Sequence, residues 1–224
     1  MAKTLEPIAY IHSDFKTKFA VPRQSGLSDN ISEIVFEKEY SSPESVRGLE
    51  EFSHIWLIWG FSENEDGKWS PTVRPPRLGG NKRVGVFATR SPFRPNGLGL
   101  SSVKLEKIYQ KNGLVRLVVT GADLVDKTPI YDIKPYLPLT DCKQNATGGF
   151  SETVKDYSLD VVFPSELKKD LSDKDISVLT DILSQDPRPG YKVDNKEFGF
   201  SYGDKEVKFI VHEGILRVVK IDNN

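Results

Sequence analysis

Positive charge is concentrated in one stretch of the sequence, residues 67–105. This stretch contains no Asp or Glu and eight basic side chains: Lys68, Arg74, Arg77, Lys82, Arg83, Arg90, Arg94 and Lys104. The planar guanidinium group of arginine binds phosphates and carboxylates through paired hydrogen bonds. Frequent prolines and glycines stiffen and shape the same stretch. It suits a polyanion such as RNA or a nucleotide. Alternatively, it is a solvated loop whose arginines pair with acids elsewhere in the fold.

Common nucleotide-binding and catalytic motifs are missing from the sequence. Gly79-Gly80 and Gly97-Leu98-Gly99 do not form the Gly-x-Gly-x-x-Gly pattern of a Rossmann site, and there is no Walker sequence or nucleophile elbow. The three histidines show no metal-ligand spacing, so we expect no metal. Cys142 is the only cysteine, which excludes a disulfide framework and fits a reducing compartment.

The composition indicates a globular protein. The 224 residues include 31 Lys and Arg against 32 Asp and Glu, and 38% are hydrophobic, which is enough for a core. Near-neutral charge argues against a polybasic protein but leaves nucleic-acid binding open, because phosphate contacts are local. The N-terminus resembles no signal peptide, and the apolar-rich run 55–61 is too short to span a bilayer. We expect a cytoplasmic protein without a membrane partner.

The elements that must position these residues are mostly strands. Apolar or alternating runs predict strands at residues 8–11, 34–36, 54–61, 84–88, 102–108 and 114–119. Asn112-Gly113 indicates a hairpin between the last two, and a short helix is expected at 43–51, capped by Ser42. Because regular strand–helix alternation is missing, we expect a mainly β fold with an N-terminal β-barrel-like domain.

The sequence changes character after the strands. Residues 139–156 are polar around Gly148-Gly149, which favours a linker. The tail predicts a strand at 159–163, a helix at 165–184 and a hairpin of 207–211 with 215–221. We therefore expect a β-barrel domain at 1–142, a linker at 143–156, and a small α+β domain at 157–224.

Several longer strings resemble the TrmO family, also called YaeB or TsaA-like proteins. The strings are residues 19–24 (FAVPRQ), 46–50 (VRGLE), 52–56 (FSHIW), 74–80 (RPPRLGG), 85–96 (GVFATRSPFRPN), 132–136 (DIKPY) and 186–191 (DPRPGY). The resemblance implies a methyltransferase that moves a methyl group from S-adenosylmethionine to N6 of N6-threonylcarbamoyladenosine, beside the anticodon of threonine tRNA. It also implies a β-barrel that binds the cofactor outside a Rossmann frame, near a homodimer interface. By this resemblance, the domain at 1–142 is the cofactor-binding and catalytic one, and the domain at 157–224 is a candidate for tRNA binding.

The same resemblance assigns the cofactor contacts and shows where this chain departs from the family. The expected contacts are Pro22, Arg23, Gln24, Ser62, Glu63, Arg90, Asp126, Lys127, Thr128, Pro129, Asp132, Lys134 and Pro135. Ser62-Glu63 stands where the family usually has a histidine. Gly97-Leu98-Gly99 replaces Pro-Ile-Gly, and Lys127 replaces the glycine of Asp-Gly-Thr-Pro.

Methyl transfer from a sulfonium is a direct displacement, so the protein must align the reacting atoms and can assist by accepting the N6 proton. Asp132 is the first candidate for this catalytic role and Asp126 the second. Alternatively, Asp132 accepts backbone N–H bonds in a turn before Lys134-Pro135.

RNA contacts are expected from a separate set of side chains: Arg74, Arg77, Arg94, Arg188 and Tyr191. For Arg188 and Tyr191 the alternative is a proline-bracketed turn that braces the tail. Trp56 and Trp59 are expected in the core, because they lie in an apolar strand. Two other functions remain open: a non-catalytic RNA-binding module, and a methyltransferase acting on a small molecule.

Overall fold

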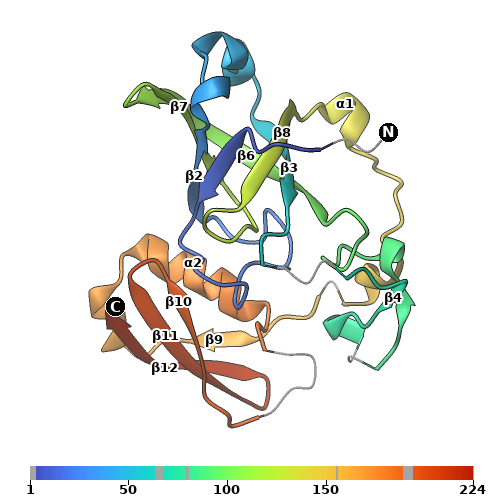
Figure 1. Cartoon of the computed structure of the whole chain (residues 1–224). Helices are drawn as coiled ribbons and strands as arrows, with labels where there is room; N and C mark the ends of the chain where they lie inside the picture. The colour runs from blue at the N-terminus through green and yellow to red at the C-terminus, as the bar shows by residue number, and fades with distance from the viewer. Residues whose placement is uncertain (1–3, 64–67, 79–80, 155, 189–193, 224) are drawn as a thin grey trace.

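The protein folds as two β-rich units (Figure 1), known from a computed structural model that describes residues 4–63, 68–78, 81–154, 156–188 and 194–223. In the first unit, six strands close into a barrel. In barrel order they are β1 (Ala9–His12), β2 (Ile31–Phe36), β7 (Leu114–Thr120), β6 (Leu98–Lys111), β3 (His54–Gly60) and β8 (Pro129–Pro135). The antiparallel pair β1–β8 closes the ring. The prediction of a mainly β, barrel-containing fold is confirmed.

The barrel interior follows the alternation of apolar residues in the sequence. Side chains from β1, β2, β3 and β7 that point inward are completely buried, among them Ile11, Ile34, Leu57 and Leu117. Their outward neighbours are polar or only half-buried, as in a sheet that covers one core.

Strand β8 was not predicted, and its alternation is interrupted. The pairing of β3 with β8 shifts register between Ile58 and Trp59, which leaves one extra residue on β8. As a result, Ile130 and Ile133 both pack on the barrel core. Asp132 and Lys134 are directed outward, where they form an ion pair at 2.9 Å. A bulge of this kind changes which face of the strand each later side chain occupies.

The expected helix at 43–51 forms as two short 3-10 helices, η2 (Pro43–Val46) and η3 (Leu49–Glu51). The Ser42 side chain caps η2 by accepting a hydrogen bond from the Glu44 N–H at 3.3 Å. Gly48 separates the two with a φ of 84°, a left-handed conformation that ends a helix. Another 3-10 helix, η1 (Lys38–Tyr40), lies just before them.

One part of the basic stretch forms a small hairpin outside the barrel (Figure 1), and its last residues belong to barrel strand β6. Strand β4 (Thr72–Val73) pairs with β5 (Val84–Gly85), and η4 (Pro76–Leu78) lies between them in sequence. The strand expected at 84–88 stops after β5 and continues as η5 (Val86–Ala88). Val86 is buried, and it anchors the turn to the body of the protein.

The second unit is an α+β domain. Its sheet has the order β10 (Phe198–Tyr202), β11 (Lys205–His212), β12 (Ile215–Asn223) and β9 (Asp160–Val162), and β9 runs parallel to β12. Helix α2 (Asp173–Ser184) buries Val178, Leu179, Ile182 and Leu183. It begins later than predicted, because Ser172 and Asp175 form a capping box and the preceding turn is the 3-10 helix η7 (Leu167–Asp170).

The two units share a core segment. Phe15 and Ala20, from the connection between β1 and β2, are buried in the hydrophobic cluster of the second domain. Phe15 also forms a β-bridge with Tyr202. Residues just before Pro22-Arg23-Gln24 are therefore fixed against the C-terminal domain. The expected linker region contains 3-10 helix η6 (Gly149–Val154), and the short helix α1 (Pro138–Asp141) precedes it. Within the described ranges, no helix is long and apolar enough to cross a membrane.

Candidate active site

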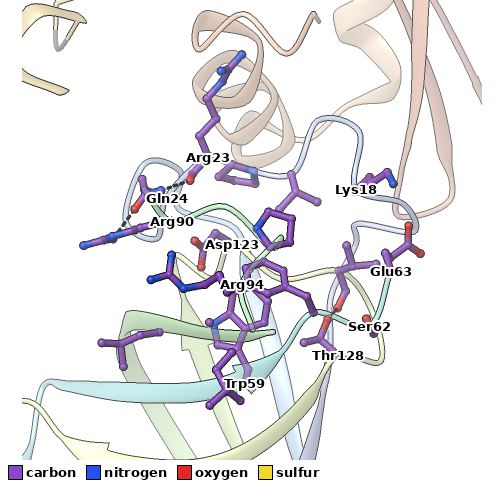
Figure 2. A pocket seen from close by; sticks show the side chains of 18 of the residues that line it. Lys18, Arg23, Gln24, Trp59, Ser62, Glu63, Arg90, Arg94, Asp123 and Thr128 are labelled. Atoms are coloured by element: carbon purple, nitrogen blue, oxygen red, sulfur yellow. Dashed lines mark hydrogen bonds between the residues drawn. The ribbon is translucent and has the colours of Figure 1, made fainter. Parts of the chain in front are cut away.

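A cavity of about 670 Å³ lies between the barrel and the segment that connects β1 with β2. Figure 2 shows Arg90 and Gln24 on one side of it, Lys18 and Glu63 on the other, and Asp123 between them. Apolar side chains form much of the wall: Val21, Pro22, Trp59, Phe61, Phe93, Leu98 and Val125. The charged side chains are of both signs, which suits a ligand that itself carries both charges.

Asp123 is the carboxylate that the barrel fixes most firmly in this cavity. The buried Trp59 donates its indole N–H to the Ser101 hydroxyl at 2.9 Å, and that hydroxyl donates to Asp123 Oδ1 at 2.5 Å. Burial raises the pKa of Asp123, while the Ser101 hydrogen bond and the charge of Arg90 oppose this increase only in part. A carboxylate with a raised pKa is a better proton acceptor than an ordinary one.

The position of Trp59 depends on a glycine. A Cβ atom on Gly99 would lie 2.3 Å from the Trp59 ring, so Gly99→Ala must displace the indole and break its bond to Ser101. We expect a loss of about 1–3 kcal/mol in unfolding free energy, the usual cost of overpacking, together with slower catalysis. Gly85→Ala is the matched control, because a Cβ there meets no atom within 4 Å. If denaturant unfolding and turnover of Gly99→Ala match those of Gly85→Ala, this packing argument is wrong.

A chain of hydrogen bonds connects the cavity wall to the second domain. Arg90 donates to the Gln24 side-chain oxygen, and the Gln24 amide donates to the Arg23 carbonyl at 2.5 Å (Figure 2). Arg23 in turn donates to the backbone carbonyl of Asp186 at 2.7 Å. Of the expected cofactor contacts, the structure thus brings together Pro22, Arg23, Gln24, Ser62, Glu63, Arg90 and Thr128 in one cavity.

The loop after η5 is fixed by its own hydrogen bonds. Thr89 donates its hydroxyl to the Val86 carbonyl at 2.8 Å. Arg94 donates to the same carbonyl at 3.2 Å and to the Thr89 carbonyl at 2.6 Å. Arg94 lines the cavity, but its guanidinium is engaged with backbone oxygens. This arrangement favours a loop-shaping role for Arg94 over the phosphate contact expected from the sequence.

Asp126 lies outside the cavity lining, in the tight turn that precedes β8. It accepts the Ser13 N–H at 3.2 Å and lies 3.4 Å from His12 Nδ1 and 3.6 Å from Lys16 Nζ. Its carboxylate therefore ties this turn to the chain after β1. Four expected cofactor contacts lie in this turn, at residues 126–129. Thr128 lines the cavity, whereas Asp126, Lys127 and Pro129 do not.

Lys127 has a φ of 64°, in the left-handed region where glycine is favoured. The turn needs this conformation, because the Lys127 N–H donates to the Ile11 carbonyl at 2.8 Å. We expect Lys127→Gly to raise the free energy of unfolding by about 1 kcal/mol, as relief of left-handed strain. Lys127→Ala keeps the Cβ and is the control, for which no increase in the free energy of unfolding is expected. Equal denaturation midpoints for the glycine and alanine variants would show that no backbone strain resides here.

The candidates of strand β8 do not line the cavity. Asp132 faces outward, pairs with Lys134, and accepts the Ile133 N–H at 2.9 Å. Pro135 lies opposite Ile55 at the far end of the strand pairing. This geometry agrees with the alternative in which Asp132 binds backbone. The physical cause is the bulge in β8, which turns Asp132 and Lys134 away from the barrel interior.

The residues expected to contact RNA fall into different environments. Arg74 is exposed on the hairpin of the basic stretch. Arg188 is buried, with bonds of 2.8 and 3.1 Å to the Asp186 carboxylate and 2.9 Å to Asp194. Arg188 therefore braces the tail and is not exposed to phosphate. The Arg77 side chain and Tyr191 lie outside the described residues, as do Gly79 and Gly80.

Sequence reasoning missed Asp123, Ser101 and Lys18. Asp123 follows the strand that ends at Thr120. An acidic residue just after a buried strand was a usable sign of a functional position. The hydrogen-bonded partner Ser101 carried no such signal, because its role depends on a residue that follows the neighbouring strand β7 and is distant in sequence. Among the described residues, no three His, Cys, Asp or Glu side chains are grouped to hold a metal ion.

These features define a class: a two-domain β-barrel protein with one cavity that offers cations, carboxylates and aromatic walls to a small charged ligand. Comparison with known proteins identifies the family to which this two-domain protein belongs. Residues 10–142 match the model of the tRNA-methyltransferase O N-terminal domain, and residues 156–224 match that of the TrmO C-terminal domain. The chain therefore belongs to the TrmO family, as its resemblance predicted.

Individual relatives support the same assignment. The tRNA (adenine(37)-N6)-methyltransferase of Escherichia coli K12 is 44% identical, over 88% of this chain and 86% of the relative. A Pyrococcus abyssi protein named "probable S-adenosyl-L-methionine-binding protein" is 39% identical, over 65% of this chain and 74% of its own length. The crystal structure of TrmO from Pseudomonas aeruginosa superimposes with a TM-score of 0.78 at 30% identity, with full coverage of both chains.

Proposed function

We propose that this protein transfers a methyl group from S-adenosylmethionine to N6 of N6-threonylcarbamoyladenosine, the base beside the anticodon of threonine tRNA. The observation that carries the proposal is Asp123, a carboxylate with a raised pKa held inside a cavity of mixed charge. Membership of the TrmO family and the name of the Escherichia coli relative support it. We further propose that the protein acts in the cytoplasm as a homodimer.

The residues of the cavity fit the proposed cofactor. A volume of about 670 Å³ is within the range of about 300–1,000 Å³ typical of small-ligand sites. Arg90 and Lys18 provide cations for the carboxylate of the cofactor. The carboxylates of Glu63 and Asp123 attract its sulfonium and ammonium charges, and the rings of Phe61 and Phe93 offer flat apolar surface to a purine.

When bound, S-adenosylmethionine supplies a sulfonium methyl group that a nitrogen can take by direct displacement. The nitrogen to be methylated carries a proton and a carbonyl substituent that withdraws its lone pair. Asp123 is placed to accept that proton, and Ser101 holds the carboxylate in position through its 2.5 Å hydrogen bond. Arg90 stays beside Asp123 through its bond to Gln24, and its charge stabilises the ionised carboxylate.

The proposal is tested by following labelled methyl from S-adenosylmethionine into threonine tRNA that carries the threonylcarbamoyl group. We expect transfer to this tRNA and none to the same tRNA without the modification. Free modified nucleoside provides a second arm, and efficient transfer to it would favour the small-molecule methyltransferase. RNA binding without transfer to correctly modified tRNA would favour the non-catalytic module. Light scattering of the purified protein tests the homodimer, and a monomer mass would contradict it.

A further inference from the structure

A second and larger cavity lies directly beside the first. Its volume is about 1,280 Å³, above the range of about 300–1,000 Å³ that small-molecule sites usually have. The β4–β5 hairpin, the loop after η5, and residues at the start of η6 line it. The two cavities share a wall made of Arg23, Gln24, Thr89, Arg90, Pro92 and Phe93.

The lining of this second cavity differs in charge from that of the first. It contains four arginines, Arg23, Arg74, Arg83 and Arg90, and none of its described lining residues is Asp or Glu. The first cavity mixes arginines with Glu63 and Asp123. A surface with only positive side chains attracts a polyanion, whereas a surface with both positive and negative side chains suits a zwitterion.

Aromatic rings are exposed among these cations. Phe87 is 72% exposed and Phe93 is 46% exposed, and Phe150 of η6 completes the set. Phe87 follows the buried Val86, and the Arg94 guanidinium lies 5.6 Å from its ring centroid, so the ring is presented on a fixed turn. Exposed phenylalanines beside arginines are the combination that binds unpaired nucleotides, by stacking and by phosphate contact.

We propose that this second cavity binds the unpaired nucleotides that flank the target adenosine, with Phe87 as the stacking platform and the exposed Arg74 as the phosphate contact. The inference rests on the proposed function, because it places the RNA chain next to the wall shared with the Asp123 cavity. The target base then enters the first cavity across Arg90 and Phe93 while its neighbours stay in the second. Arg83 donates to the Thr72 hydroxyl at 2.7 Å and to the Thr72 carbonyl at 3.1 Å, so its guanidinium ties together the two sides of the β4–β5 hairpin.

The test uses the whole protein and an RNA hairpin with the anticodon stem and loop of threonine tRNA, labelled by a fluorescent purine analogue at each position beside the target adenosine in turn. Stacking on an aromatic ring quenches such an analogue. We expect quenching in the wild type at one or more of these positions, loss of it in Phe87→Ala, and recovery in Phe87→Trp. Affinity for the hairpin should fall about 5- to 150-fold in Phe87→Ala, the range for loss of one stacked base.

Control variants separate this inference from general effects. Leu139→Ala removes a side chain that is 93% exposed and lines neither cavity, and it should bind as the wild type does. Arg74→Ala should reduce the salt slope of RNA binding by about 0.7, while Arg217→Ala, on the exposed face of β12, should not change it. The quenching, affinity and salt-slope measurements are made without cofactor, so they remain decisive even if methyl transfer is never observed.

Three outcomes would overturn the inference. The first is unchanged quenching and affinity in Phe87→Ala, which would place the RNA elsewhere. The second is loss of S-adenosylmethionine binding in calorimetry of Phe87→Ala, which would assign this cavity to the cofactor. The third is a shift of Phe87→Ala from dimer to monomer with RNA affinity retained, which would assign the surface to a second copy of the chain.

Discussion

Asp123→Asn is expected to reduce the single-turnover rate of methyl transfer by about 10²- to 10⁴-fold, the usual contribution of a positioned general base. The amide keeps the shape of the side chain and can still accept the hydrogen bond from Ser101. It cannot accept a proton. Affinity for S-adenosylmethionine, measured by calorimetry, should change much less than the rate. A large fall in the rate with a small change in cofactor affinity would identify Asp123 as a proton acceptor.

Two comparisons make the Asp123 result decisive. Asp160→Asn removes an exposed carboxylate on β9 and is the matched control, with an unchanged rate expected. Asp132→Asn tests the base predicted from the sequence. The cavity geometry predicts that it reduces the rate of methyl transfer less than Asp123→Asn does. If Asp132→Asn reduces the rate strongly while Asp123→Asn transfers methyl at nearly the wild-type rate, Asp132 on β8 is the base and the assignment to Asp123 is wrong.

The raised pKa of Asp123 also predicts how activity and stability depend on pH. Transfer needs the ionised carboxylate, so the rate should fall with decreasing pH through a pKa above the ordinary 3.8, and this acidic limb should vanish in Asp123→Asn. The folded state binds the Asp123 proton more tightly than the unfolded state does. The stability that this proton provides is present below the ordinary pKa and is lost as pH rises through the raised one. The Asn variant should lack this decline in denaturant titrations, and an equal decline in both proteins would contradict the assignment.

Arg188→Ala is expected to lower the free energy of unfolding by about 3–5 kcal/mol, because it leaves the buried Asp186 carboxylate without its cation. Tyr157 donates its hydroxyl to the same carboxylate at 2.6 Å, but this neutral hydrogen bond does not replace the paired, charged contact of the Arg188 guanidinium. Since Arg23 donates to the Asp186 carbonyl, the cavity wall should loosen as well. Urea unfolding measures the first effect, and weaker binding of S-adenosylmethionine measures the second.

Arg217→Ala is the control for this prediction, because Arg217 is exposed on β12 of the same domain and its loss should be nearly neutral. The sequence had suggested Arg188 as a phosphate contact. If Arg188→Ala keeps its stability and cofactor affinity but loses tRNA affinity and salt dependence, the phosphate role is correct and the buried ion pair is not important.

Much of the barrel could be predicted because its strands bury one face and show regular alternation. The strand predicted at 54–61 forms β3 for this reason, and the turn signal Asn112-Gly113 correctly indicated the hairpin of β6 and β7. Strand β8 was missed because a proline lies at each end and a bulge breaks its alternation after Ile130. Helix α2 starts later than predicted because the capping box at Ser172 fixes its first turn. Leu167 and Leu171, which precede the cap, pack on the core from the 3-10 helix η7 and its C-terminal end.

The site was predictable only where sequence neighbours stay together in space. Pro22, Arg23 and Gln24 form one wall of the cavity, as their continuous string suggested, and Arg90 lies against Gln24. Asp123 could not be found in this way, because Ser101 on β6 and Trp59 on β3 are distant from it in sequence and come close only when the strands pair. Arg188 looked available for phosphate in the sequence, and only the fold shows it enclosed by Asp186 and Asp194.

The most direct test of the central claim is the identity of the methylated nucleoside. Threonine tRNA carrying N6-threonylcarbamoyladenosine is incubated with the protein and methyl-labelled S-adenosylmethionine, digested to nucleosides, and analysed by chromatography and mass spectrometry. We predict that the threonylcarbamoyl nucleoside disappears while an equal amount of its N6-methyl derivative, carrying all of the label, takes its place. Label on any other nucleoside, or no label on correctly modified tRNA, would contradict the account.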